Sequence, residues 1–480
     1  MASISIKKAA LINAGAKYSQ VIIQLILNMI LSRILSPEDY GVMAIITVFT
    51  TFFLTFSNLG FGSAIIQNKR LTKNDTDNIY SFTCYIAIFI SILFCLFSYP
   101  LSLMYKSNIY IYIGCLLSLS LLFNTLNMVP NALLMKEKKF IKVGIRNVTV
   151  TIMTSIIAII LAFVGFKYYA LAIQSILTAF FTYTWNYYST RPKFVFKFQF
   201  SSIKKIAGFS AFQFGFNIVQ YFSRNLDHLL TGGVISSVAL GYYDKAYKLT
   251  RYPVENLAQV ITPVLHPILS DYQSDQAYIF RQYQKITKLL SLVAIYITVI
   301  FGLCSKEVML IMFGSQWTES IDCLQIFSVT IWLQMLGACT GAIFQSLGKT
   351  NLLFITGLMN SVITAGGFAI GIMGGTIEDV AISFSITSFI NFFVSNYMLV
   401  RKGFGENSLR FIRRFIPELG IALVMVLFYK LVPINIDNIY VSMLLKGILL
   451  TLAYICGILI FRQYKYLKII FVKFKKRKKC

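Results

Sequence analysis

Long apolar stretches alternate with short polar segments along almost the whole chain. The hydrocarbon core of a bilayer is about 30 Å thick and is crossed by about 20 residues of α-helix. Fourteen stretches have about this length, although the thirteenth is short. Their approximate limits are 11–33, 41–66, 79–100, 109–134, 147–166, 168–189, 207–230, 240–267, 284–304, 323–346, 352–373, 379–400, 417–432 and 441–461. The pattern therefore predicts an all-α integral membrane protein with about fourteen transmembrane helices.

The composition supports this class of protein and excludes most others. Hydrophobic residues make up 57% of the 480 residues, charged residues make up 13%, and the mean hydropathy is +0.71. Because soluble domains carry roughly 25% charged residues, a water-soluble enzyme is excluded. The sequence contains no GxxxxGK[ST] phosphate loop, no HExxH or GxSxG motif and no CxxC pair. We therefore predict no catalytic residue, no metal site and no cofactor other than a coupling ion.

Charge is distributed unevenly between the two sides of the predicted membrane. The chain has 44 Lys and Arg residues against 18 Asp and Glu residues, a formal net charge of +26. With the N-terminus inside, 33 of the bases fall on inner segments and five on outer segments. The positive-inside rule predicts such a split, so we expect both termini in the cytoplasm. Because the bases lie in short gaps between apolar runs, a nucleic-acid partner is excluded.

Two predicted spans carry the same polar stripe, 200 residues apart. Polar residues recur in both at spacings of 4, 3, 4 and 4, which places them on one face of a helix. The stripes are Asn13, Lys17, Gln20, Gln24 and Asn28, and Gln213, Asn217, Gln220, Arg224 and His228. The same offset relates Ser36 to Ser236 and Gly41 to Gly241. A repeat displaced by six spans keeps its orientation, which favours two pseudo-symmetric six-helix lobes around a central cavity. Chance similarity, or shared ancestry without a shared cavity, is the alternative.

The repeat predicts four parts of the chain. An N-lobe with helices 1 to 6 covers residues 1–200, and a C-lobe with helices 7 to 12 covers residues 201–400. Two further helices lie in residues 401–461, and residues 462–480 form a basic cytoplasmic tail that anionic membrane lipids would hold. Cys304 and Cys323 flank one outer loop, where a disulfide is an alternative to two buried thiols.

The eighth predicted span is the most heavily charged. Its polar residues Asp244, Lys248, Arg251, Glu255, Gln259, Thr262 and His266 share one helix face, and Pro253 is expected to kink it. One interpretation is intrahelical ion pairing, Asp244 with Lys248 and Arg251 with Glu255. The other is a cavity in which surplus cations bind a phosphate or diphosphate. The cations are Lys17, Arg224, Lys245, Lys248 and Arg251, against the acids Asp227, Asp244 and Glu255. Asp227 either pairs with Arg224 or serves as a proton or sodium site.

Several short motifs resemble one known family. They are SRILSPEDYG (32–41), NLGFGSAIIQ (58–67), RNLDHLLTG (224–232), ALGYYDKAYKL (239–249), FGSQW (313–317) and FQSLGKTN (344–351). With the arrangement of six, six and two spans, they are similar to the Wzx-type polysaccharide flippases, in the branch of the teichuronic-acid and colanic-acid exporters. These belong to the multidrug, oligosaccharidyl-lipid and polysaccharide exporter superfamily, whose fold resembles that of the multidrug and toxin exporters.

The resemblance implies translocation of an undecaprenyl-diphosphate-linked oligosaccharide across a bacterial cytoplasmic membrane for surface polysaccharide synthesis. It also implies alternating access driven by an ion gradient or the membrane potential, with the polysaccharide polymerase and chain-length regulator as possible partners. The expected substrate-binding residues are Lys17, Gln20, Gln24, Gln220, Arg224, Lys245, Lys248 and Arg251, and the expected ion-coupling residues are Asp227 and Glu255, with H⁺ or Na⁺. The alternatives are a drug or cation exporter of the same superfamily and a membrane-embedded glycan polymerase or ligase.

Overall fold

The computed structural model describes residues 6–58, 61–68, 71–137, 139–197, 199, 201, 221, 225, 227–258, 265, 269–434 and 436–466. The chain divides into two compact units, Met1–Gly241 and Tyr242–Cys480. The division falls inside helix α10 (Ser237–Pro253). The two compact units divide later in the chain than residue 200. The predicted boundary between two lobes at residue 200 stays a prediction.

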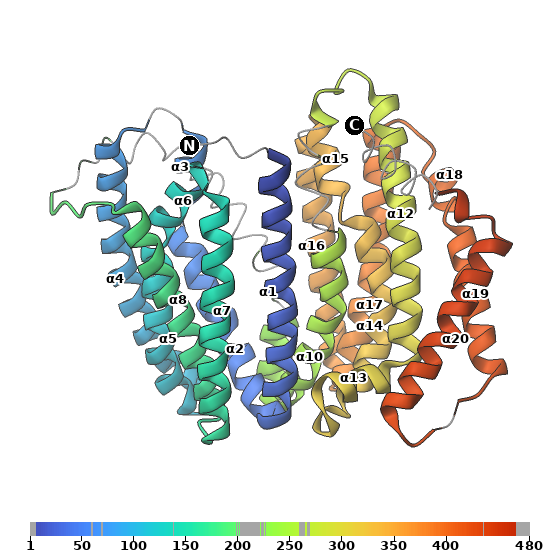
Figure 1. Cartoon of the computed structure of the whole chain (residues 1–480), viewed down its shortest axis with the longest axis horizontal. Coiled ribbons are helices and arrows are strands. Elements are labelled where there is room, and N and C mark those ends of the chain that lie inside the picture. The colour runs from blue at the N-terminus through green and yellow to red at the C-terminus, as the bar shows by residue number, and fades with distance from the viewer. Residues whose placement is uncertain are drawn as a thin grey trace. The chain divides into compact units, whose positions relative to one another are not determined.

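The first unit is built from long helices joined by short turns. Its described elements are α1 (Ile6–Ile34), α2 (Pro37–Asn58), α3 (Phe61–Gln67), α4 (Lys73–Met104), α5 (Ile109–Leu126), α6 (Met128–Lys136), α7 (Phe140–Phe163), α8 (Tyr168–Thr190), the π-helical turn η1 (Thr231–Ile235) and the start of α10. Helix α5 packs between α4 and α8, and α7 contacts both α1 and α8 (Figure 1). The thirty-two-residue helix α4 begins at a capping box formed by Thr72 and Asp75, which satisfies the first free backbone N–H groups.

The second unit continues from α10. Its elements are η2 (Val254–Ala258), α12 (Gln276–Leu303), α13 (Ser305–Phe313), η3 (Ser315–Trp317), α14 (Ser320–Gly337), α15 (Thr340–Ser346), α16 (Thr350–Met373), α17 (Ile377–Asn396), η4 (Tyr397–Gly403), α18 (Ser408–Arg413), α19 (Ile416–Leu431) and α20 (Ile439–Ile460). Helix α14 lies between α12 and α17, while α19 and α20 pack on each other and on α12. The predicted disturbance at Pro253 is confirmed, because α10 ends there and a π-helical turn follows.

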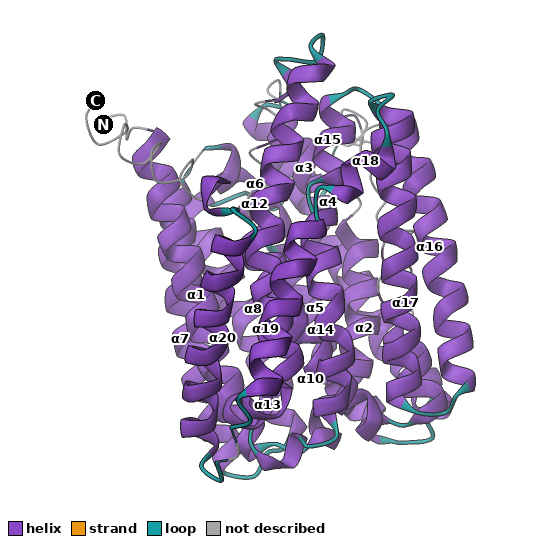
Figure 2. Ribbon diagram, turned by 90° about the vertical axis from the view of Figure 1, so that its right-hand side faces the viewer, coloured by secondary structure: helices purple, strands orange, loops and turns teal. Residues whose placement is uncertain are grey.

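The predicted class is confirmed: the described residues are helical and contain no strand (Figure 2). Nine of the described helices are long and apolar enough to cross a membrane, so the protein is a multi-pass membrane protein. The predicted total of fourteen spans stays a prediction. The predicted separation of two spans by Lys167 agrees with the structure, where α7 ends at Phe163 and α8 begins at Tyr168.

Helix α4 shows how the chain presents itself to lipid. A stripe of large apolar side chains at spacings of 4, 3, 4, 3 and 4 is exposed on this helix. The stripe is Tyr85, Phe89, Ile92, Leu96, Tyr99 and Leu103. The opposite face buries Ala87, Ile90, Phe94 and Ser98 against the unit. A soluble protein rarely exposes so long an apolar stripe, and here it matches the hydrocarbon of a bilayer.

The starts of α2 and α10 cross at a pair of glycines within the first unit. A Cβ atom on Gly41 would lie 1.7 Å from the carbonyl oxygen of Ser237, and one on Gly241 would lie 2.1 Å from that of Pro37. Each helix is capped by the serine before it: Ser36 and Asp39 form a reciprocal cap, and the Ser236 hydroxyl accepts from the Ala239 N–H. The residues that the sequence repeat pairs at an offset of 200 therefore meet in space.

Helix α13, which follows α12 directly, is linked to α20 by polar contacts. Lys446 forms an ion pair with Glu307 at 2.5 Å, and Ser442 donates a hydrogen bond to the same carboxylate oxygen at 3.0 Å. Burial raises the pKa of Glu307, but the hydrogen bonds from Lys446 and Ser442 outweigh it and hold the pKa below its ordinary value. The disulfide considered between Cys304 and Cys323 is wrong, since both are free buried thiols.

Candidate functional site

The charged face of α10 and η2 forms two consecutive ion pairs along the helix. Asp244 Oδ2 lies 2.7 Å from Lys248 Nζ, and Arg251 Nε lies 2.9 Å from Glu255 Oε1. The predicted i,i+4 pairing is therefore confirmed. We call these four residues the charge ladder. The Asp244 side chain is 2% exposed while that of Lys248 is 60% exposed, so the acid is held inside unit 2 and the ammonium is presented outward.

Aromatic packing inside unit 2 fixes the charge ladder in place. Tyr247 stacks on Tyr243 and meets Phe327 and Phe384 edge to face. The Tyr247 hydroxyl lies 3.1 Å from Arg251 Nη1, and the guanidinium carbon lies 5.6 Å from the tyrosine ring. Arg251 is thus held by a carboxylate, a hydroxyl and a ring face, an arrangement that orients its planar group.

Lys245 occupies a different place from the charge ladder. It is 3% exposed, and its ammonium lies 4.7 Å from the ring centre of Phe313 and 4.9 Å from that of Trp317. Both rings belong to the segment α13 to η3. Lys245 therefore contributes cation–π contacts to the interior of unit 2, and its role in substrate binding stays a prediction.

Asp227 pairs with its neighbour along the chain. Its Oδ1 atom lies 2.9 Å from His228 Nδ1, and Asp227 is 1% exposed. His228 is buried and hydrogen-bonded to this carboxylate. Arg224, the partner considered for Asp227, lies outside the described residues, as does Gln220. A role for Asp227 in ion coupling stays a prediction.

The polar stripe of the first span is accessible on α1. Lys17 and Gln24 are exposed and Gln20 is half-buried, while Leu27 and Leu31 are buried further along. Helix α1 packs on α7 within unit 1. The three predicted residues thus share a polar face that keeps their donors and acceptors available to a ligand.

A buried arginine in unit 1 was missed by sequence reasoning. Arg146, expected on an inner segment, lies within α7 and is 5% exposed. It donates to the side-chain oxygens of Asn131, Asn147 and Asn186, and Asn186 in turn donates to Asn127. The spacing of Asn124, Asn127 and Asn131, three and four residues, is the sequence signal that could have indicated it. Asn127 and Asn131 also line a cavity of about 330 Å³.

Replacing Arg146 with Ala should lower the stability of the protein by about 2 to 3 kcal/mol, since buried amide oxygens lose their donor. Arg146→Lys should recover little, because an ammonium lacks the five spread N–H donors with which a guanidinium reaches several amides. Lys142→Ala, at an exposed position of the same helix, is the matched control and should change little. Thermal unfolding of the purified variants measures this, and equal stability of Arg146→Ala and wild type would contradict it.

The described residues combine long apolar helices with an ordered charged face, within a multi-pass membrane protein. A family model described as "Polysaccharide biosynthesis protein" matches residues 30–322. The chain belongs to this polysaccharide biosynthesis family, and its resemblance to Wzx-type flippases of the exporter superfamily is confirmed.

Curated relatives cover most of the chain. The lipopolysaccharide biosynthesis protein WzxC of Escherichia coli is 22% identical over 465 residues, which are 90% of this chain and 88% of that protein. The teichuronic acid biosynthesis protein TuaB of Bacillus subtilis is 22% identical over 408 residues, 81% of this chain and 82% of that protein. Among solved structures, the lipid II flippase MurJ in an inward closed conformation is similar with a TM-score of 0.75 at 16% identity. It covers 96% of this chain and 100% of its own. The chain therefore shares its fold with this solved structure.

Proposed function

We propose that the protein is a flippase that moves a polyprenyl-diphosphate-linked oligosaccharide from the inner to the outer leaflet of a bacterial cytoplasmic membrane. Membership of the polysaccharide biosynthesis family supports this class of cargo. The observation that carries the proposal is the charge ladder, which presents the Lys248 ammonium outward on a membrane-protein helix. An exposed charge on such a helix is costly against lipid, so it indicates a polar ligand or a water-filled path.

The chemistry of the ladder suits a diphosphate. Arg251 has five N–H donors. Its hydrogen bonds to Glu255 and Tyr247 use two of them. The remaining donors form a planar set that matches phosphate oxygens. Lys248 adds a point charge one helical turn away. We assign the diphosphate to Lys248 and Arg251, and Lys17 and Arg224 stay predicted cationic contacts of the substrate. Gln20, Gln24 and Gln220 would bind sugar hydroxyls.

Ion coupling would use the carboxylate of Glu255 or of Asp227. Glu255 is half-exposed beside Arg251 and Asp227 is buried beside His228. Either carboxylate can exchange a proton or Na⁺ as the protein alternates between inward and outward access. A membrane potential that acts on the charged face is the alternative energy source. Neither route needs ATP.

Substituting Lys248 or Arg251 with Gln should reduce translocation roughly 10- to 100-fold, because each change removes a charge-assisted hydrogen bond worth about 1.5 to 3 kcal/mol. The measurement is outward movement of a labelled lipid-linked oligosaccharide in proteoliposomes, together with surface polysaccharide in cells. Lys402→Gln, at an exposed base outside the ladder, is the matched control and should retain activity.

Three outcomes discriminate between the possible functions. Full translocation by both ladder variants would overturn the assignment of the diphosphate site. Loss of the protein from the membrane would favour a structural role for the ion pairs instead. Efflux of a cationic dye, or a change in glycan chain length without translocation, would identify a drug exporter or a polymerase.

A further inference from the structure

A basic cavity of about 580 Å³ lies in unit 2, away from the charge ladder. Its walls come from the first half of α12, from the junction of α18 and α19, and from the segment after α20. The polar and aromatic lining residues that matter here are Arg281, Lys285, Lys288, Arg414, Gln463 and Tyr466. Four of these six side chains are cationic.

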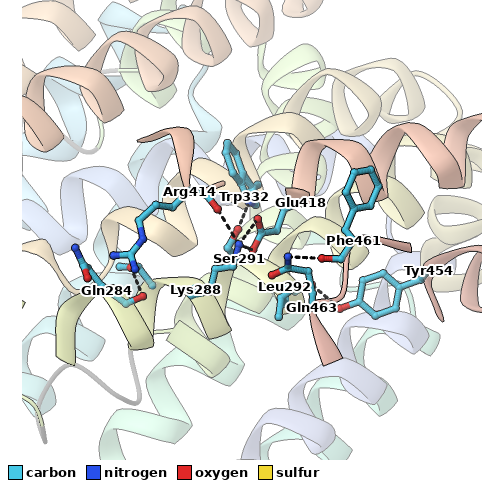
Figure 3. A network of polar contacts seen from close by, with 11 residues as sticks. Gln284, Lys288, Ser291, Leu292, Trp332, Arg414, Glu418, Tyr454, Phe461 and Gln463 are labelled. Carbon is cyan, nitrogen blue, oxygen red and sulfur yellow. Dashed lines mark hydrogen bonds and ion pairs between the residues drawn. The ribbon is translucent and has the colours of Figure 1, made fainter. Parts of the chain in front are cut away.

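The floor of the cavity is a buried ion pair. Lys288 Nζ lies 2.7 Å and 2.8 Å from the two carboxylate oxygens of Glu418, and donates to the Arg414 carbonyl oxygen at 2.7 Å (Figure 3). The Glu418 side chain is fully buried. This carboxylate neutralises Lys288. The other three cations therefore leave the cavity with a positive surplus.

Those three cations stand where they can reach a ligand. Arg281, Lys285 and Arg414 are exposed at the rim. Within the described ranges none of them forms an ion pair with a carboxylate. Arg281 and Lys285 are spaced four residues apart on α12, so they share one face, and Arg414 faces the same cavity from the end of α18. Like charges gathered in this way repel each other until an anion binds between them.

The surroundings place the cavity at the level of lipid headgroups. Helix α18 buries Phe411 and exposes Leu409, and α19 begins with the exposed Ile416. Apolar side chains beside exposed arginines are typical of a helix at a membrane interface. The positive-inside distribution predicts that this end of unit 2 faces the cytoplasm.

We infer that this cavity binds the headgroup phosphate of an anionic glycerophospholipid of the inner leaflet. Arg281, Lys285 and Arg414 donate to the phosphate, and the acyl chains follow the exposed apolar side chains of α18 and α19. Basic pockets between transmembrane helices at the cytoplasmic side bind lipid phosphates in this manner. The bound lipid joins α12, the start of α19 and the end of α20.

Gln463 indicates which headgroup fits. It is 7% exposed, and its amide nitrogen donates to the Phe461 carbonyl at 2.7 Å. Its amide oxygen accepts no hydrogen bond from any residue in the described part of the chain. A buried acceptor in the cavity wall suits a headgroup with a hydroxyl donor, such as the glycerol of phosphatidylglycerol.

The test measures lipid binding by the purified full-length protein. Delipidated protein in zwitterionic detergent is titrated with phosphatidylglycerol or phosphatidylcholine, and retained lipid is counted by native mass spectrometry. The triple variant Arg281→Gln, Lys285→Gln and Arg414→Gln keeps Lys288 and Glu418 and should bind phosphatidylglycerol roughly 100-fold more weakly. The control triple variant is Lys73→Gln, Lys193→Gln and Lys197→Gln, which removes the same charge from exposed sites in unit 1 and should match wild type.

Other results would overturn the inference. Equal weakening in both triple variants would mean non-specific attraction to a basic surface. If inorganic phosphate without lipid raises the unfolding temperature as much as phosphatidylglycerol does, the ligand of the cavity is a soluble anion and not a lipid. If the triple variant of the cavity does not fold, the same lipid-binding measurement on Gln463→Leu tests the inference. This substitution changes no charge and should weaken phosphatidylglycerol binding about tenfold through the lost hydroxyl contact, and unchanged binding would refute the site. Because translocation is not the readout, failure here leaves the proposed transport function standing.

Discussion

Replacing Gly41 with alanine is expected to prevent accumulation of correctly folded protein. The new Cβ would lie 1.7 Å from the Ser237 carbonyl oxygen and 2.5 Å from the carbonyl carbon. Both are backbone atoms of a capped helix start, so no side-chain rotation relieves the clash. Overpacking costs about 1 to 3 kcal/mol where neighbours can shift, and a backbone clash belongs at or above the upper end of that range. The yield of monodisperse protein and its unfolding temperature in detergent measure the effect.

Gly241→Ala should behave in the same way, because its Cβ would lie 2.1 Å from the Pro37 carbonyl oxygen. Gly357→Ala is the matched control, since it is also a helical glycine but has no atom within 4 Å of the added Cβ. It should be neutral or more stable by up to about 1 kcal/mol, the difference in helix propensity between the two residues. Wild-type stability in Gly41→Ala would show that the helix crossing is not required.

Removing one partner of the buried Lys288 and Glu418 pair is expected to have the next largest effect. Glu418→Leu would leave the Lys288 ammonium with the Arg414 carbonyl but without its carboxylate. An uncompensated buried charge of this kind costs about 3 to 5 kcal/mol. The double variant Lys288→Met with Glu418→Leu removes both charges and should recover most of the loss, to within about 1 to 2 kcal/mol of wild type.

Wild type, Lys288→Met, Glu418→Leu and the double variant form a double-mutant cycle, and their stabilities are compared by thermal or denaturant unfolding. Glu137→Gln breaks the exposed pair with Lys139 and should change stability by less than about 1 kcal/mol. If the double variant is as unstable as Glu418→Leu, the loss comes from altered packing around α19 rather than from an uncompensated charge.

Local patterns allowed much of the structure to be predicted. The apolar runs predicted helices because a membrane requires every backbone group to be paired within the segment. The i,i+4 pairs of α10 were predictable because neighbours on one helix turn need no tertiary information. The offset of 200 paired Gly41 with Gly241, although it did not predict that the two would touch.

Contacts between distant segments could not be predicted in this way. Lys288 and Glu418 are 130 residues apart, and no spacing in the sequence relates them. Arg146 was counted among inner bases because two of its three asparagine partners, Asn131 and Asn186, come from other parts of the chain. Lys245 was grouped with the cations of the predicted cavity, and the sequence did not indicate its contacts with the rings of Phe313 and Trp317.

The sequence by itself determined the class of protein, its helical character, the charge bias of its loops and the repeat. These follow from hydrophobic periodicity and spacing, which act within one helix or one bilayer crossing. Only the tertiary structure decided which charges are neutralised inside a unit and which are presented outward. That outcome depends on desolvation, which is set by the helices that pack around a side chain and not by the residues beside it in sequence.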